Sequence, residues 1–114
     1  MPTTPVNESL FRLGLNDALP ISEEATTSRV VVNNDVLRTV IFTFDAGQML
    51  TEHASTKAVV VTLLEGEMDF SIGERNERMK AGDVIYLAPG DRHALTAVTP
   101  CRMELVMVDV NSGA

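Results

Sequence analysis

The sequence predicts an all-β protein, an antiparallel sandwich or barrel, and three observations support this fold class. Short segments in which apolar and polar residues alternate recur from Ser28 onward, and this period-two pattern is typical of half-buried strands. Clusters of Gly, Asn, Asp and Pro separate these segments, as turns do in sandwiches and barrels. The length of 114 residues and the hydrophobic content of 45% are sufficient for one domain with its own core.

The N-terminal residues 1–27 are expected to form a helix and leader segment, and residues 28–114 to form the single barrel domain. A short helix is predicted from about Pro5 to Leu13, because Thr4 can cap its start and Gly14 can end it. Its apolar face, expected to pack on the body, consists of Val6, Leu10 and Leu13. The polar connection that follows fits a flexible leader and a docked edge segment equally well.

The predicted strands follow in close succession along the rest of the chain. The clearest alternation places Met68, Phe70 and Ile72 on one face of a strand and acidic or small residues on the other. A continuous apolar run from Ala58 to Leu64 precedes it. Further strands are predicted at 29–32, 36–44, 78–80, 83–87, 94–98 and 102–110.

Charge and cysteine content exclude several classes of function. The formal net charge is -7, and no Lys/Arg cluster reverses it locally, so neither nucleic acid nor an anionic membrane is an expected partner. No apolar run reaches the roughly 18 residues that a membrane helix needs. Cys101 is the only cysteine, which rules out an internal disulfide.

The N-terminus lacks the basic and apolar regions of a secretory signal, and we expect a cytoplasmic protein.

Two glycine- and histidine-containing segments carry a resemblance to a known family. The first runs from Gly47 through His53 to Gly66, and the second runs from Gly82 through Pro89-Gly90 to His93. In this order, with two strand patterns between them, they resemble the two motifs of the cupin superfamily. The resemblance covers about residues 36–110 and implies an antiparallel jelly-roll (cupin) β-barrel whose mouth holds the site.

The resemblance also implies a set of metal ligands, and this sequence retains only part of it. Metal-binding cupins use two His and one Glu from the first motif and one His from the second. Here His53 and His93 match, whereas Ser55 stands at the second His position and Val59 at the Glu position. Ser is a poor ligand and Val cannot coordinate. We therefore expect no tightly bound cofactor, although two imidazoles can hold Zn, Ni, Cu or Fe weakly.

The predicted binding site combines the histidine pair with largely apolar walls. Strand alternation and the motif positions give these candidate ligand-binding residues: His53, Ser55, Val59, Met68, Phe70, Tyr86, His93 and Met103. His53 and His93 are also the candidate metal ligands. The sequence is compatible with either direction, inward or outward, of the Tyr86 side chain.

Three functions are compatible with these sequence features. The first is a small-molecule-binding cupin barrel, which the depleted ligand set favours. The alternative is a metal-dependent cupin enzyme of the dioxygenase, isomerase or decarboxylase type, acting on a small organic substrate. A pure interaction scaffold is disfavoured by the retained histidines, and the sequence leaves open whether the protein is an enzyme. Because the run from Ala58 to Leu64 is apolar on both faces, a homodimer is expected.

Overall fold

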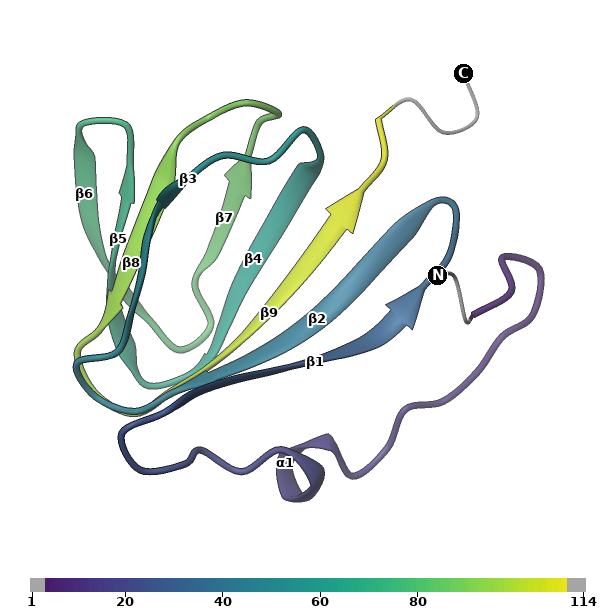
Figure 1. Ribbon diagram of the computed structural model, residues 1–114, viewed down its shortest axis with the longest axis horizontal. Helices are drawn as coiled ribbons and strands as arrows, with labels where there is room; N and C mark the ends of the chain where they lie inside the picture. The colour runs from purple at the N-terminus through teal and green to yellow at the C-terminus, as the bar shows by residue number, and fades with distance from the viewer. Residues whose placement is uncertain (1–3, 111–114) are drawn as a thin grey trace.

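The computed structural model describes residues 4–110 as two antiparallel β-sheets that face each other around one core (Figure 1). The larger sheet has the strand order β1-β2-β9-β4-β7, and the smaller has the order β3-β8-β5-β6. The strands are β1 (Thr26–Asn33), β2 (Leu37–Phe44), β3 (Met49–His53), β4 (Ala58–Glu65), β5 (Glu67–Ile72), β6 (Arg75–Lys80), β7 (Val84–Leu87), β8 (His93–Ala97) and β9 (Cys101–Val108). The predicted all-β jelly-roll fold is confirmed.

Alternation along the strands decides which side chains fill the space between the sheets. On β4, Val61 and Leu63 are buried, whereas Val60 and Leu64 on the opposite face are exposed. On β5, Met68 and Phe70 are buried in the same core. Burial of such side chains stabilises the fold by about 1.5–3 kcal/mol each. The period-two pattern of the sequence therefore fixes the inner face of each sheet.

The tight passage from β4 to β5 depends on Gly66. Its φ of 86° is in the left-handed region, which favours glycine. A Cβ atom at this position would lie 2.2 Å from the carbonyl oxygen of Pro100 and 2.9 Å from Sγ of Cys101. The close approach of these two chain segments therefore requires a residue without a side chain.

The N-terminal segment differs from the predicted helix. The only helix among residues 4–110 is α1 (Leu15–Ala18), and the stretch from Pro5 to Leu13 is not helical. Thr4 instead pairs with Asn33 at the end of β1, through one backbone hydrogen bond of 3.0 Å and one to its hydroxyl. A nine-residue helix is only marginally stable in isolation, and these bonds compete with its first turn. A short helix in the N-terminal segment is thus confirmed, but its predicted bounds, Pro5 to Leu13, were wrong.

The apolar side chains of that segment are consequently left in solvent. Leu13 is 81% exposed and Phe11 is 84% exposed. The segment is attached to the sheet through polar groups, because the Arg12 side chain donates a 2.8 Å hydrogen bond to the carbonyl oxygen of Val31. Residues 4–25, which we call the strap, thus run along the outside of β1 (Figure 1).

Candidate functional site

Two histidines on neighbouring strands form the centre of the candidate site. His53 ends β3 and His93 begins β8, and the two residues are direct partners in the antiparallel ladder. Their ring centroids are 4.2 Å apart, with the ring planes inclined by 62°. The structure therefore brings together the only two histidines of the chain, which the sequence places 40 positions apart.

Backbone carbonyl groups set the tautomer of both rings. Nδ1 of His53 lies 2.8 Å from the carbonyl oxygen of Thr51, and Nδ1 of His93 lies 3.1 Å from that of Asp91. A carbonyl oxygen only accepts, so in each contact Nδ1 must carry the proton. In the neutral ring, Nε2 then keeps its lone pair. Both imidazoles are thus prepared to accept a hydrogen bond or to donate a lone pair to a cation.

The two rings differ in their surroundings. His93 is only 6% exposed and stacks on Phe70, with centroids 6.1 Å apart and planes 9° apart, whereas His53 is exposed. Burial lowers the pKa of His93, and repulsion from His53 adds to this, while the hydrogen bond to Asp91 acts in the opposite direction. The neutral form of His93 is therefore favoured over its charged form more strongly than in an ordinary histidine.

The space beside the pair is small. The cavity measures about 20 Å³, which is room for about one water molecule. It is lined by Leu50, His53, Val61, Phe70, Leu87, His93, Ala94, Leu95, Met103 and Leu105. Apart from the imidazoles the walls are apolar side chains, so a polar group that enters finds its hydrogen-bond partners only at the two rings or on the backbone.

Four of the predicted wall residues are buried in the core, and two of these four line the cavity. Phe70 and Met103 line the cavity. Met68 and Val59 are buried in the same core, without lining the cavity. Val61, the next inward residue on β4, takes the lining position instead of Val59. The alternation of β4 was the available signal, since it gives Val61 the same face.

Two predicted site residues lie elsewhere. Tyr86 is 61% exposed and pairs with Val60, on the outer face of the larger sheet. Because alternation on β7 turns Leu87 inward, Tyr86 must point outward. Ser55 follows the end of β3, and its hydroxyl oxygen accepts a 3.0 Å hydrogen bond from the backbone N–H of Lys57. The placement of Ser55 and Tyr86 in the histidine site is therefore corrected.

The donor set does not fit a resident metal centre. Within residues 4–110, no three His, Cys, Asp or Glu side chains gather in a geometry for one ion. The nearest acidic neighbour in the chain, Glu52, pairs with Arg92 at 2.8 Å in an exposed ion pair. Protein sites for zinc supply three or four side chains, and this site offers two imidazoles. The two imidazoles alone therefore fall short of a complete protein metal site.

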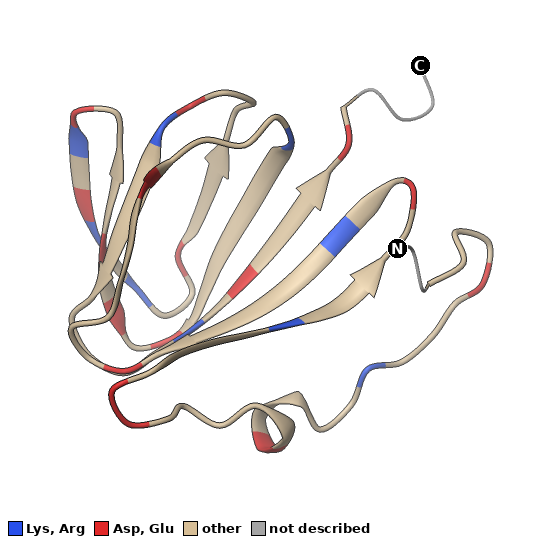
Figure 2. Cartoon of the chain, in the orientation of Figure 1, with Lys and Arg blue, Asp and Glu red and all other residues tan. Residues whose placement is uncertain are grey.

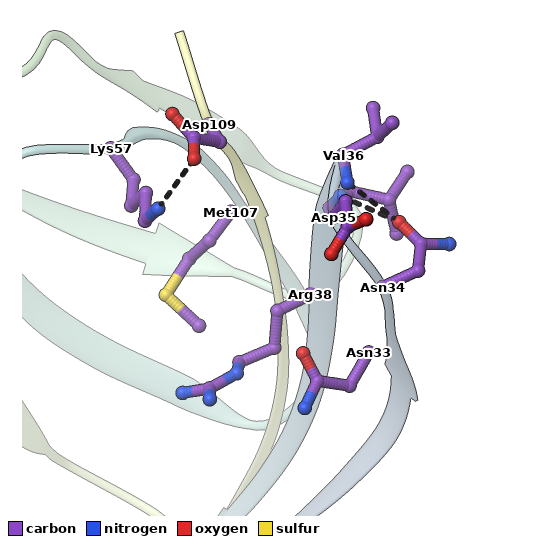
Figure 3. Close-up of a pocket in the computed structure, with 9 residues that line it drawn as sticks. Asn33, Asn34, Asp35, Val36, Arg38, Lys57, Met107 and Asp109 are labelled. Atoms are coloured by element: carbon purple, nitrogen blue, oxygen red, sulfur yellow. Dashed lines mark hydrogen bonds and ion pairs between the residues drawn. The ribbon is translucent and has the colours of Figure 1, made fainter. Parts of the chain in front are cut away.

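The structure also has two larger hollows, away from the histidine pair, which the sequence alone does not predict. One measures about 340 Å³, at the gap between β6 and β7, and reaches Phe70 and Ile85. The other measures about 320 Å³ and lies beside the turn between β1 and β2, with Arg38, Lys57 and Met107 in its lining (Figure 3). The sequence feature that could have indicated the second hollow is Arg38, a cation that shares a strand face with Val40 and Phe42.

Solved structures with this fold are numerous. A conserved protein of unknown function from Streptococcus pyogenes is 29% identical, with 98% of each chain covered and a TM-score of 0.83. A cupin superfamily protein from Desulfitobacterium hafniense is 17% identical, with 92% of this chain and 94% of that chain covered and a TM-score of 0.78. An RmlC-like cupin from Desulfovibrio desulfuricans is 23% identical, with 88% and 97% covered and a TM-score of 0.78.

The family follows from the sequence and fold together. Comparison with functionally curated proteins finds no match. None of the helices in residues 4–110 has the length and apolar character needed to cross a membrane. Residues 40–109, which include both histidines and both glycine-containing motifs, match the family model described as the cupin domain. The chain belongs to the cupin family.

Proposed function

We propose that this cupin is a small-molecule-binding protein whose ligand is recognised at the His53/His93 pair. The observation that carries the proposal is the cross-strand pair itself, with ring centroids 4.2 Å apart and each Nδ1 held by a backbone carbonyl group. This arrangement leaves two Nε2 acceptors beside apolar walls. Preorganised acceptors of this kind fix the orientation of a ligand in an otherwise apolar site.

The chemistry of the pair selects the class of ligand. Neutral imidazoles accept hydrogen bonds at Nε2, so the complementary ligand group is a hydroxyl or an N–H donor. The cavity of about 20 Å³ admits only such a small polar group, which would take the place of one water molecule. The rest of the ligand would lie over the exposed ring of His53. An apolar alcohol, phenol or indole has this combination of features.

Histidine NMR signals test the proposal directly. The chain has two histidines, so their ring carbon–proton signals are assigned with one His53→Ala variant. Titration with phenol, indole and hexan-1-ol at pH 7.5 should shift both signals together and saturably for at least one of these probes. If both ring signals stay unmoved up to the solubility limit of every probe, the proposal is wrong.

A matched substitution distinguishes recognition at the pair from loose hydrophobic binding. His53 is exposed, so His53→Phe should leave the fold intact while keeping a ring and removing the acceptor. Probe affinity should fall by about tenfold, which corresponds to the loss of roughly one net hydrogen bond. Unchanged affinity in His53→Phe would mean that the probes bind without using the imidazole.

The second candidate is a metal-dependent cupin enzyme, and one observation favours it. Metal-binding histidines usually donate their second ring N–H to a carbonyl or carboxylate group, and both rings here do so. Elemental analysis of protein purified without added metal separates the two candidates. Stoichiometric metal that resists chelators would support the enzyme, whereas metal well below one equivalent supports the binding protein.

A further inference from the structure

The hollow beside the turn between β1 and β2 has the size of a ligand site and lies apart from the histidine pair. Its volume is about 320 Å³, within the range of small-molecule pockets. Residues of both charge signs line it, and Met107 contributes an apolar side chain. Figure 3 shows the side chains of Arg38 and Met107 projecting into the same hollow. None of these residues belongs to the predicted histidine site.

Arg38 occupies an unusual position for a cation. It is the ladder partner of Met107, and on β2 it shares a face with Val40, which is buried, and Phe42, which packs against the core. A charged side chain on an otherwise apolar sheet face must keep its head group solvated or paired. At its strand end, Arg38 keeps it solvated at the hollow.

The guanidinium group of Arg38 is also available for a ligand. Within residues 4–110, no carboxylate pairs with it. The other cation of the hollow, Lys57, already pairs with Asp109 at 3.3 Å. A planar guanidinium presents parallel N–H donors that match the two oxygens of a carboxylate. We propose that Arg38 binds the carboxylate of a small organic acid in this hollow.

The balance of charges selects a monoanion. The lining contains Arg38 and Lys57 together with Asp35 and Asp109, so a bound carboxylate adds one negative charge to a neutral set. Basic and acidic residues are likewise interspersed over the whole fold (Figure 2), within a chain of net charge -7. A phosphate with two charges would be repelled by these carboxylates and by the chain as a whole.

The floor of the hollow indicates an apolar chain attached to that carboxylate. Met107 lines the hollow, and Leu105, the next inward residue on β9, lines the cavity at the histidine pair. Two residues along a strand span about 7 Å. The alkyl chain of a bound acid would therefore lie on Met107 and extend toward Leu105. This proposal rests on Arg38 and Met107 and stands independently of ligand recognition by the histidines.

Calorimetric titration of the full chain with hexanoate, hexan-1-ol and inorganic phosphate tests the proposal. Hexanoate should bind, hexan-1-ol should bind at this site at least about tenfold more weakly, and phosphate should not compete with hexanoate. Arg38→Gln should weaken hexanoate binding by a similar factor. Arg29→Gln is the matched control, because Arg29 is an exposed arginine on the neighbouring strand β1, outside the lining of this hollow.

Each contrary outcome has a definite meaning. Equal hexanoate affinity in Arg38→Gln and the parent protein would overturn the proposal, and so would the absence of binding at millimolar hexanoate. Equal weakening by Arg29→Gln would reveal only a general charge effect and would also overturn it. Hexanoate binding that survives in His53→Phe supports a site separate from the histidine pair. Loss in His53→Phe with retention in Arg38→Gln would assign the acid to the histidines and reject Arg38.

Discussion

Arg102 and Leu19 are joined by a hydrogen bond that spans 83 positions of the sequence: Nη1 of Arg102 donates to the carbonyl oxygen of Leu19 at 2.8 Å. The same guanidinium group donates from Nε to a carboxylate oxygen of Glu65 at 3.0 Å. The Arg102 side chain is 6% exposed, whereas that of Glu65 is 48% exposed. One nearly buried arginine thus ties the strap to the larger sheet.

Replacement of Arg102 by Met should loosen the strap. The change removes both hydrogen bonds while keeping an unbranched side chain, and we expect a loss of about 1–3 kcal/mol in unfolding free energy. Urea denaturation measures this loss, and proteolysis within residues 4–25 should become faster. Arg92→Met, which breaks an exposed ion pair with Glu52, should change stability by less than about 1 kcal/mol. Equal effects of the two substitutions would contradict this role of Arg102.

Gly66→Ala should destabilise the fold more strongly than a Gly→Ala substitution at an open turn. Its Cβ would lie 2.2 Å from a backbone oxygen, and its φ of 86° disfavours any side chain. We expect a loss of at least about 3 kcal/mol, by analogy with severe overpacking. Gly73→Ala is the control, because its φ is 59° and no atom lies within 4 Å of its added Cβ; it should cost about 1 kcal/mol. Thermal unfolding of both variants would show whether crowding or backbone strain dominates.

Acid should destabilise the fold through His93. The pKa of His93 is lowered in the folded state by burial, so in acid the unfolded chain binds more protons than the folded one. The stabilisation that neutral His93 contributes is fully present above the unfolded-state pKa of 6.5. It declines as the pH falls through the lowered pKa of the folded state. The melting temperature of the parent protein should therefore decrease below pH 6.5 by more than that of a His93→Gln variant. Parallel pH profiles would refute the assignment.

Added transition metal should bind weakly at the histidine pair. Zn²⁺ or Ni²⁺ should bind with an affinity that decreases as the pH falls, because protons compete for the imidazole lone pairs. His53→Ala and His93→Ala should each abolish binding, whereas Glu52→Gln should preserve it, since Glu52 is engaged with Arg92. Calorimetry gives the affinities. Binding that persists in either histidine variant would place the metal elsewhere.

The outer face of the larger sheet should be covered by a second copy of the chain. Val84 and Tyr86 on β7 are 62% and 61% exposed, and Leu64 on β4 is 42% exposed. Buried Thr43 and Arg102 lie at the other end of this face, near the strap. Light scattering at micromolar protein should give the mass of a homodimer, and Tyr86→Glu should give a monomer. Leu13→Glu, on the exposed strap, should remain dimeric; a monomeric parent protein would reject the interface.

The alternation of residues predicted the sheets well because it is a local signal. Met68 and Phe70 are buried on β5 as their period-two pattern requires. The motif spacing likewise predicted that His53 and His93 belong to one candidate site. A short N-terminal helix is present, but at Leu15–Ala18 and not at the predicted Pro5 to Leu13. Helical periodicity does not take competing partners into account, and Thr4 finds one in Asn33, far along the chain.

The rest of the candidate site depends on geometry that the sequence does not encode locally. Tyr86 differs from Leu87 by one position, and only the pairing of β7 with β4 determines which of the two faces the core. The hollow at Arg38 forms where the ends of β2 and β9 meet the segment that contains Lys57. No sequence pattern within one segment predicts that these three segments lie together in the fold.

The hydrogen bonds from the histidine rings to Thr51 and Asp91 have a consequence for how this site can change. Each ring is oriented by the main chain only two residues before it, so no distant side chain has to be preserved to keep Nε2 available. Substitutions in the apolar walls can therefore alter the shape of the site while its acceptors persist. If the proposed function holds, the two short segments that end in His53 and His93 form a self-contained recognition element, which other residues of the barrel can adapt to different ligands.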